Sequence, residues 1–144
     1  MNISIDKIFT QQQMEDCLAI RRLVFIEEQN VPEELEIDGL DVEAVHYHIT
    51  VEQKTIGTAR VRDRDNKAKI ERVVLLAEFQ GKGYGKKLMR YILDDIKKDK
   101  KASQVTLSAQ TYLIPFYQGL GFTLCSGEEY MDAGIAHQDM YLLL

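Results

Sequence analysis

The hydrophobic pattern between residues 69 and 109 constrains the fold most, because its period changes twice. Residues 69–76 have the β-rich composition of a strand, whereas residues 83–98 place apolar side chains on one face of a helix. Residues 105–109 return to a strand pattern. Two strands of one sheet joined by a helical crossover lie parallel, and the crossover is right-handed. The stretch therefore predicts one parallel β-α-β unit.

The segments on either side of this unit predict antiparallel strands and further helices. Strands are expected at residues 3–8, 45–51, 57–62, 122–125 and 139–144, helices at 10–29 and 112–120, and a loop at 31–41. Thr10 is expected to cap the first helix. The predicted fold class is α/β, with a mixed, mostly antiparallel central sheet, flanking helices and a single domain over residues 1–144.

Charge, cysteine usage and hydropathy narrow the class of protein. The formal charge of −5 provides no basic field, so nucleic acid and anionic membranes are not expected partners. Cys17 and Cys125 predict two buried free thiols in a reducing compartment. The start of the chain lacks the segments of a signal peptide, and the longest apolar run, residues 73–77, is too short to span a bilayer. We therefore expect a cytoplasmic protein. These features do not decide whether it forms a homodimer.

Three glycines lie between the strand and the helix of the β-α-β unit, at Gly81, Gly83 and Gly85. Glycines there let the backbone approach a ligand and turn successive N–H groups outward, and the helix N-terminus favours an anion. Lys82 within the turn and Lys86 and Lys87 just after it add positive charge, so a pyrophosphate is a suitable ligand. The spacing fits neither a Walker loop nor a dinucleotide-binding fold. The alternative is a tight turn whose glycines serve packing only.

Two motifs, in this order, resemble the GNAT superfamily of N-acetyltransferases. Gln80-x-x-Gly83-x-Gly85 is similar to the coenzyme A signature of that superfamily, and Phe116-Tyr117-Gln-Gly-Leu-Gly121-Phe122 is similar to its later aromatic element. Three other segments, which begin at Phe25, Leu107 and Asp132, resemble the small bacterial ElaA/YjcF-like branch. The resemblance covers nearly the whole chain. It implies an acetyl-CoA-dependent enzyme that acetylates a primary amine by direct attack in a ternary complex, without a metal.

The resemblance also implies where acetyl-CoA binds. Backbone N–H groups of the turn would hold the pyrophosphate, and the edge of the preceding strand would pair with the pantetheine amides. The residues assigned to the cofactor in this way are Val73, Val74, Leu75, Gln80, Gly81, Lys82, Gly83, Tyr84, Gly85, Lys86, Gln110 and Tyr117. At Gln110 many relatives have an asparagine, so this contact is the least specific of the set.

The candidate catalytic residues are Tyr117 and Glu71. Tyr117 matches a tyrosine that lies near the coenzyme sulfur in many relatives, so it is expected to act as the general acid. The alternative is a core aromatic whose hydroxyl is satisfied nearby. Glu71 is a candidate base, because an alkylamine must lose a proton before it attacks. Glu71 can equally form an ion pair with a neighbouring lysine or arginine, and water can carry the proton instead.

Acidic residues gather between residues 27 and 43, where no lysine or arginine occurs. If Glu28 and Glu33 border the acceptor pocket, they would attract a small or cationic amine. The alternative is a solvated loop. Asp132 and His137 belong to a late segment that reaches either the same pocket or a partner subunit. A competing function is a coenzyme A-binding regulatory module with little or no turnover.

Overall fold

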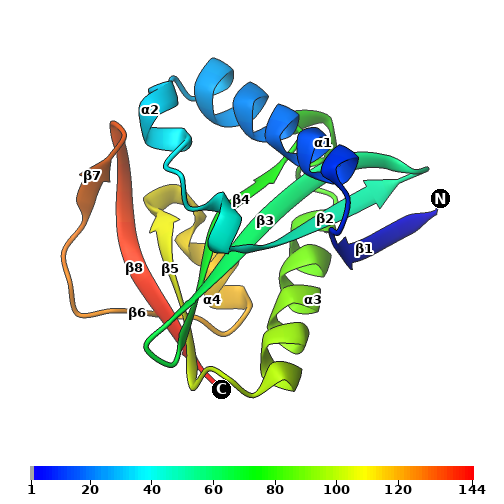
Figure 1. Ribbon diagram of the computed structural model, residues 1–144. Coiled ribbons are helices and arrows are strands. Elements are labelled where there is room, and N and C mark those ends of the chain that lie inside the picture. The colour runs from blue at the N-terminus through cyan, green and yellow to red at the C-terminus, as the bar shows by residue number, and fades with distance from the viewer. Residues whose placement is uncertain (1) are drawn as a thin grey trace.

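The computed structural model describes residues 2–144. Its strands form one mixed sheet in the order β1-β2-β3-β4-β5-β8-β6, with β7 paired to β8 (Figure 1). The strands are β1 (Ile3–Lys7), β2 (Val45–Val51), β3 (Lys54–Arg64), β4 (Lys67–Leu75), β5 (Gln104–Gln110), β6 (Thr123–Leu124), β7 (Tyr130–Asp132) and β8 (Ile135–Leu143). β4 and β5 pair in parallel and every other strand pair within residues 2–144 is antiparallel, which confirms the predicted fold class.

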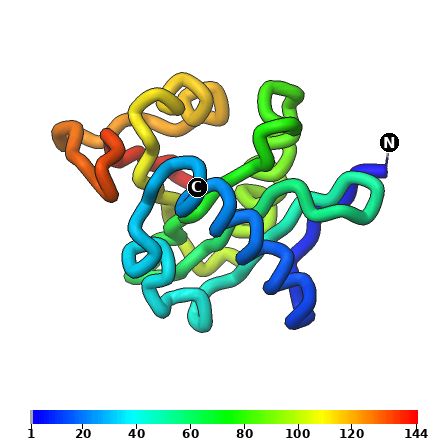
Figure 2. The backbone as a smooth tube through the Cα atoms, turned by 90° about the horizontal axis from the view of Figure 1, so that it is seen from above, coloured from blue at the N-terminus to red at the C-terminus, as the bar shows by residue number. Residues whose placement is uncertain are grey.

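The helices cover both faces of the sheet (Figures 1 and 2). They are α1 (Gln11–Arg21), the π-helix η1 (Arg22–Glu28), α2 (Glu33–Glu36), α3 (Tyr84–Asp99) and α4 (Ile114–Gly119), with short 3-10 turns η2 (Asp41–Glu43), η3 (Ala77–Phe79) and η4 (Thr111–Leu113). α1 and η1 pack with Val74 on one face of β4. α3 and α4 contribute to the larger core on the opposite face.

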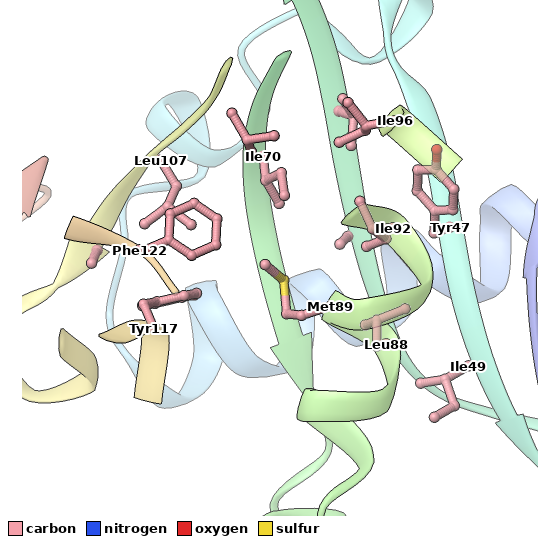
Figure 3. Close-up of a cluster of buried hydrophobic side chains, with 14 of the residues drawn as sticks. Tyr47, Ile49, Ile70, Leu88, Met89, Ile92, Ile96, Leu107, Tyr117 and Phe122 are labelled. Carbon is pink, nitrogen blue, oxygen red and sulfur yellow. The ribbon is translucent and has the colours of Figure 1, made fainter. Parts of the chain in front are cut away.

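The larger core lies between α3 and the sheet (Figure 3). The predicted apolar face of α3 is buried there, with Leu88, Met89 and Ile92 fully inaccessible. Ile70 of β4 and Leu107 of β5 lie in the same core and are partners in the parallel register. Burial of side chains of this size stabilises a fold by about 1.5–3 kcal/mol each. The core therefore fixes the two strands that flank the glycine-containing turn.

β4 and β5 are paired only at their first halves. The parallel register joins Lys67–Ile70 to Gln104–Leu107. Beyond this point a bulge interrupts the pairing of β4 with β3, between Thr58 and Arg60. On β4, Arg72 has a left-handed φ of 56°, which is uncommon for a residue other than glycine. The second half of β4 therefore does not pair with β5 within residues 2–144.

Several predicted elements differ from the structure. The expected helix over residues 10–29 is an α-helix that becomes a π-helix, where Gln29 N donates to Val24 O over five residues. Thr10 caps it as predicted, through a capping box with Gln13. The expected loop over residues 31–41 contains α2, and β7 was not predicted. Cys17 is buried, but the prediction of a buried Cys125 is wrong, because that free thiol is partly accessible.

No helix within residues 2–144 is both long and apolar enough to cross a bilayer.

Candidate functional site

A groove of about 870 Å³ opens where β4 and β5 separate. Its walls come from the second half of β4, the end of β5, the turn before α3, and α4. η1, α2 and the β7–β8 hairpin also contribute residues. The groove thus brings together segments from residue 24 to residue 137. Its size is in the range of small-molecule and cofactor sites.

The glycine-containing turn has the conformation expected of an anion-binding site. Gly81 and Gly83 have φ values of 75° and 88°, in the left-handed region that glycine adopts without steric cost. Gly83 is the N-cap of α3, and no side chain from residues 2–144 caps this helix end. The first N–H groups of a 16-residue helix are therefore left for a ligand. Gly81, Gly83, Gly85 and Lys86 all line the groove.

Residues of β4 and the start of the turn, which the sequence assigned to coenzyme A, form one wall of the groove. Val73, Val74 and Leu75 line the groove, so one edge of β4 faces it. Gln80 also lines the groove, but its side-chain Nε2 donates to Leu75 O at 3.1 Å and ties the turn to the strand. The structure thus places the turn beside the free edge of the strand.

Lys82 and Tyr84 are not among the groove-lining residues. Lys82 is exposed, whereas the Tyr84 ring is buried in the core, edge-on to Phe79 at 6.0 Å. Tyr84 can offer a ligand only its backbone. Gln110 lines the groove, and its Nε2 donates to Gln29 Oε1 at 3.1 Å. This bond joins the end of β5 to the residue after η1.

The Tyr117 side chain lines the groove from α4 and is 6% exposed. Its ring packs edge-on against Phe116 at 5.1 Å and Phe122 at 6.0 Å. Burial raises the pKa of Tyr117 to about 12. Among residues 2–144 no group hydrogen-bonds to its hydroxyl, in contrast to the alternative of a satisfied core phenol. The result is a fixed, protonated phenol with a free O–H donor.

Glu71 lines the groove in an ion-paired state. Its carboxylate lies 2.6 Å from Arg62 Nε, 3.1 Å from Arg60 Nη2 and 3.6 Å from Lys69 Nζ. Burial alone would raise the pKa of Glu71, but the hydrogen bond from Arg62 and the nearby cations together lower it. A carboxylate held this way is a weak proton acceptor. The structure therefore has the ion pair that the sequence left as the alternative.

Arginines pair with the acidic segment over residues 27–43. Glu36 Oε1 lies 2.7 Å from Arg21 Nε and 3.3 Å from Arg72 Nε. Other pairs join Arg60 to Asp38 and Asp41, Arg62 to Glu43, and Arg22 to Glu33. These arginines lie outside the acidic segment, so their pairing was not visible from local sequence.

Glu28 and Glu33, the predicted acceptor residues, are exposed and do not line the groove. From α2, Leu35 and Glu36 line it instead.

Other groove residues were not assigned from the sequence to a role. Gln29, Lys69, Ser108, Tyr130 and His137 line the groove. The sequence leaves open whether Asp132 and His137 reach the pocket or a partner subunit, and in the structure the β7–β8 hairpin brings both to the groove. No local pattern in the sequence gives this placement, because it depends on the strand register that pairs Gln110 of β5 with His137 of β8.

Comparison with known proteins places this groove in a family. The model of the acetyltransferase (GNAT) domain matches residues 8–144. The chain is 38% identical over 130 residues to the N-acetyltransferase YjcF of Bacillus subtilis, a match that covers 90% of this chain and 92% of YjcF.

Solved structures have the same fold. Escherichia coli ElaA matches with a TM-score of 0.88 and 27% identity, over 98% of this chain and 99% of ElaA. A GNAT family acetyltransferase of Elizabethkingia anophelis with acetyl-CoA bound matches with a TM-score of 0.74 and 18% identity, over 99% of both chains. The family match spans the turn, the parted strands and Tyr117, and the chain therefore belongs to the GNAT family of N-acetyltransferases, in the branch of YjcF and ElaA.

Proposed function

We propose that the protein transfers the acetyl group of acetyl-CoA to a primary amine by direct attack, with both substrates bound in the groove. The observation that carries the proposal is the free edge of β4 beside an uncapped helix N-terminus, with the unpartnered Tyr117 hydroxyl in the same groove. Strand edge, anion site and proton donor are the three features that an extended phosphorylated thioester requires.

The residues present fit acetyl-CoA. The N–H groups at the start of α3 and the Lys86 side chain would hold the pyrophosphate. The main chain of Val73–Leu75 would pair with the pantetheine amides, as an added strand does at a sheet edge. The acetyl-CoA bound to the Elizabethkingia anophelis protein of the same fold supports this donor. The thioester supplies an activated carbonyl, and the protein positions it.

Proton movements in the reaction assign a role to Tyr117. The amine nitrogen forms a bond to the thioester carbonyl carbon, and the carbon–sulfur bond then breaks with its electron pair on sulfur. The sulfur takes up a proton, which the Tyr117 hydroxyl can donate because its pKa of about 12 keeps it protonated at neutral pH. An ammonium substrate loses one proton before it attacks, and the proton that the nitrogen releases as the amide forms returns Tyr117 to its phenol form.

The acceptor is a small primary amine. The sequence suggested that several acidic residues attract a cationic group on it, whereas in the groove this attraction depends on one carboxylate. Of the acidic residues that line the groove, Glu36 and Glu71 are ion-paired. Asp132 lines the groove and has no ion pair within residues 2–144. One free carboxylate at the groove would attract a cationic amine.

Acetyl-CoA consumption with a panel of primary amines tests this proposal. Release of free coenzyme A thiol should follow enzyme and amine concentration, and calorimetry should show acetyl-CoA binding without an amine. A free acetyl-CoA concentration of 100 times its dissociation constant adds about 2.7 kcal/mol to the free energy of unfolding, and a rise in melting temperature measures this. Binding without turnover across the panel would favour the coenzyme A-binding module, and no binding would contradict both.

A further inference from the structure

A primary amine needs a proton acceptor in the groove, and most ionisable groups there are unsuited to that role. Glu36 lies between Arg21 and Arg72 and is almost fully buried. Glu71 is held by cations that lower its pKa. Tyr117 and Tyr130 have pKa values raised to about 12, so both remain phenols at neutral pH. Asp132 is exposed to water beside the β7–β8 turn. The imidazole that lines the groove is His137.

We propose that His137 is the general base that deprotonates the acceptor amine; this inference rests on the proposed function. His137 lies on β8 between two paired strands, opposite Gln110 of β5 and opposite Tyr130 of β7. It is half-buried and lines the same groove as Tyr117 and the free edge of β4. The base and the proposed acid thus come from different strands and helices that meet at one groove.

A single hydrogen bond sets the tautomer of His137. Its Nδ1 lies 2.7 Å from the backbone carbonyl oxygen of Ile135. A carbonyl oxygen only accepts, so Nδ1 carries the hydrogen. In the neutral ring Nε2 then holds the lone pair, and it has no hydrogen-bond partner within residues 2–144. The ring is therefore prepared to accept a proton at Nε2.

A neighbouring tyrosine holds the His137 ring in place. The Tyr130 ring stacks on it, with centroids 6.0 Å apart and planes 20° apart. The Tyr130 hydroxyl donates to Asp139 Oδ1 at 2.5 Å and also bonds to Ser108. Tyr130 is thus anchored at both its ring and its hydroxyl, and it acts as a positioning residue for His137.

The charged and titratable groups that share the groove with His137, together with Asp139 beside Tyr130, come from several elements. β7 contributes Tyr130 and Asp132, β8 itself Asp139, η4 Tyr112 and α4 Tyr117. β4 contributes Lys69, Glu71 and Arg72, α2 contributes Glu36, and α3 contributes Lys86.

An ammonium acceptor loses two protons in the reaction. One leaves through His137 Nε2 to solvent, and the second balances the proton that ends on the coenzyme sulfur.

The first test compares pH–rate profiles. In the wild-type protein, kcat/KM should rise with pH along an acidic limb, because the base must be unprotonated to accept the proton of the amine. His137→Gln should lower kcat by about 10²–10⁴-fold and remove this limb while acetyl-CoA binding is kept. In His137→Ala, added imidazole should restore part of the rate. Gln138→Asn, on the adjacent position of β8, is the matched control and should retain wild-type kinetics.

A second readout is independent of any acceptor. The protein has three histidines, so nitrogen chemical shifts can be assigned by comparison with His137→Gln. The His137 signals should show the Nδ1–H tautomer when neutral. An Nε2–H tautomer, or a His137→Gln variant with wild-type rate and pH profile, overturns the proposal. A wild-type protein that shows the Nδ1–H tautomer and binds acetyl-CoA but acetylates no amine contradicts the proposed function instead.

Discussion

Arg21 of α1 and Glu36 of α2 form an ion pair of 2.7 Å between Nε and Oε1, and both side chains are almost fully buried. Arg72 of β4 approaches the same carboxylate oxygen at 3.3 Å. Since Glu36 lines the groove, these contacts connect one wall of the groove to the first helix and to β4, the strand proposed to bind the cofactor. The groove wall is therefore part of the stable structure rather than a free loop.

Glu36→Gln should destabilise the protein strongly. Removal of one partner of a buried ion pair costs about 3–5 kcal/mol where the remaining charge is uncompensated. Arg21 keeps Asp41 at 2.8 Å and Arg72 keeps Asp38 at 3.2 Å, so the expected loss is at the lower end, about 3 kcal/mol. Urea unfolding at neutral pH measures this as a lower midpoint. Glu34→Gln is the matched control, because Glu34 is exposed on the same helix, and it should change stability by less than about 0.5 kcal/mol. Equal midpoints for the two variants would show that the buried pair contributes nothing.

The same network predicts acid sensitivity. Hydrogen bonds from Arg60 lower the pKa of Asp38 from 3.8, and Glu71 has its pKa lowered from 4.5 despite burial. A carboxyl group with a lowered folded-state pKa stabilises the fold above its unfolded-state pKa, and this contribution is lost as pH falls below it. Stability should decline below about pH 4.5, and Asp38→Asn should flatten that decline. An unchanged slope in Asp38→Asn would contradict this.

Gly83→Glu should remove acetyl-CoA binding and leave the fold intact. A Cβ at this position meets no atom within 4 Å, so the cost is limited to the positive φ of 88°, about 1–2 kcal/mol. The added carboxylate would oppose the pyrophosphate at the helix N-terminus. We expect calorimetry to show affinity reduced by roughly a hundredfold or more, the equivalent of about 3 kcal/mol.

Two further variants separate charge from strain at this turn. Gly83→Ala has the strain without the charge and should retain most of the affinity. Gly127→Glu adds the same charge at a position with open space and should bind normally. Full affinity in a folded Gly83→Glu protein would place the pyrophosphate elsewhere.

Tyr117→Phe should lower kcat by about 10²–10⁴-fold with little change in acetyl-CoA affinity. Because its hydroxyl has no partner within residues 2–144, the variant should not be less stable, which a melting curve can verify. Tyr91→Phe makes the same substitution on α3, away from the groove lining, and should leave kcat unchanged. A Tyr117→Phe enzyme with wild-type turnover would assign the residue to packing alone.

The β-α-β unit and its turn were predictable because their signals are local. The apolar repeat of α3 and the glycines at positions 81, 83 and 85 lie within one continuous stretch. The burial and ion pairing of the acidic segment could not be predicted from such local signals. Glu36 resembles a solvated acid in the sequence, and its partners lie 15 residues before it, at Arg21, and far after it, at Arg72.

Placement of His137 likewise depends on distant pairing. The registers of β8 with β5 and with β7 decide that His137 faces the groove, and no local pattern reports them. The hydrogen bond between Gln29 and Gln110 joins residues 81 positions apart. Sequence motifs therefore predict the side of the groove that we propose for the cofactor, whereas the proposed acceptor side depends on pairing that only the tertiary structure gives.

The final prediction separates two possible origins of a preference for cationic amines. Asp132 lines the groove without an ion pair among residues 2–144, whereas Glu28 is exposed outside its lining. Asp132→Asn should raise the KM of a cationic amine by up to about fivefold, the equivalent of ~1 kcal/mol for a solvent-accessible charge pair. The effect should shrink at high salt, as the screening length falls below ~8 Å. Glu28→Gln should leave this KM unchanged, and a neutral amine should be indifferent to both variants. A rise in KM with Glu28→Gln alone would move acceptor recognition to the acidic segment, as the sequence had suggested.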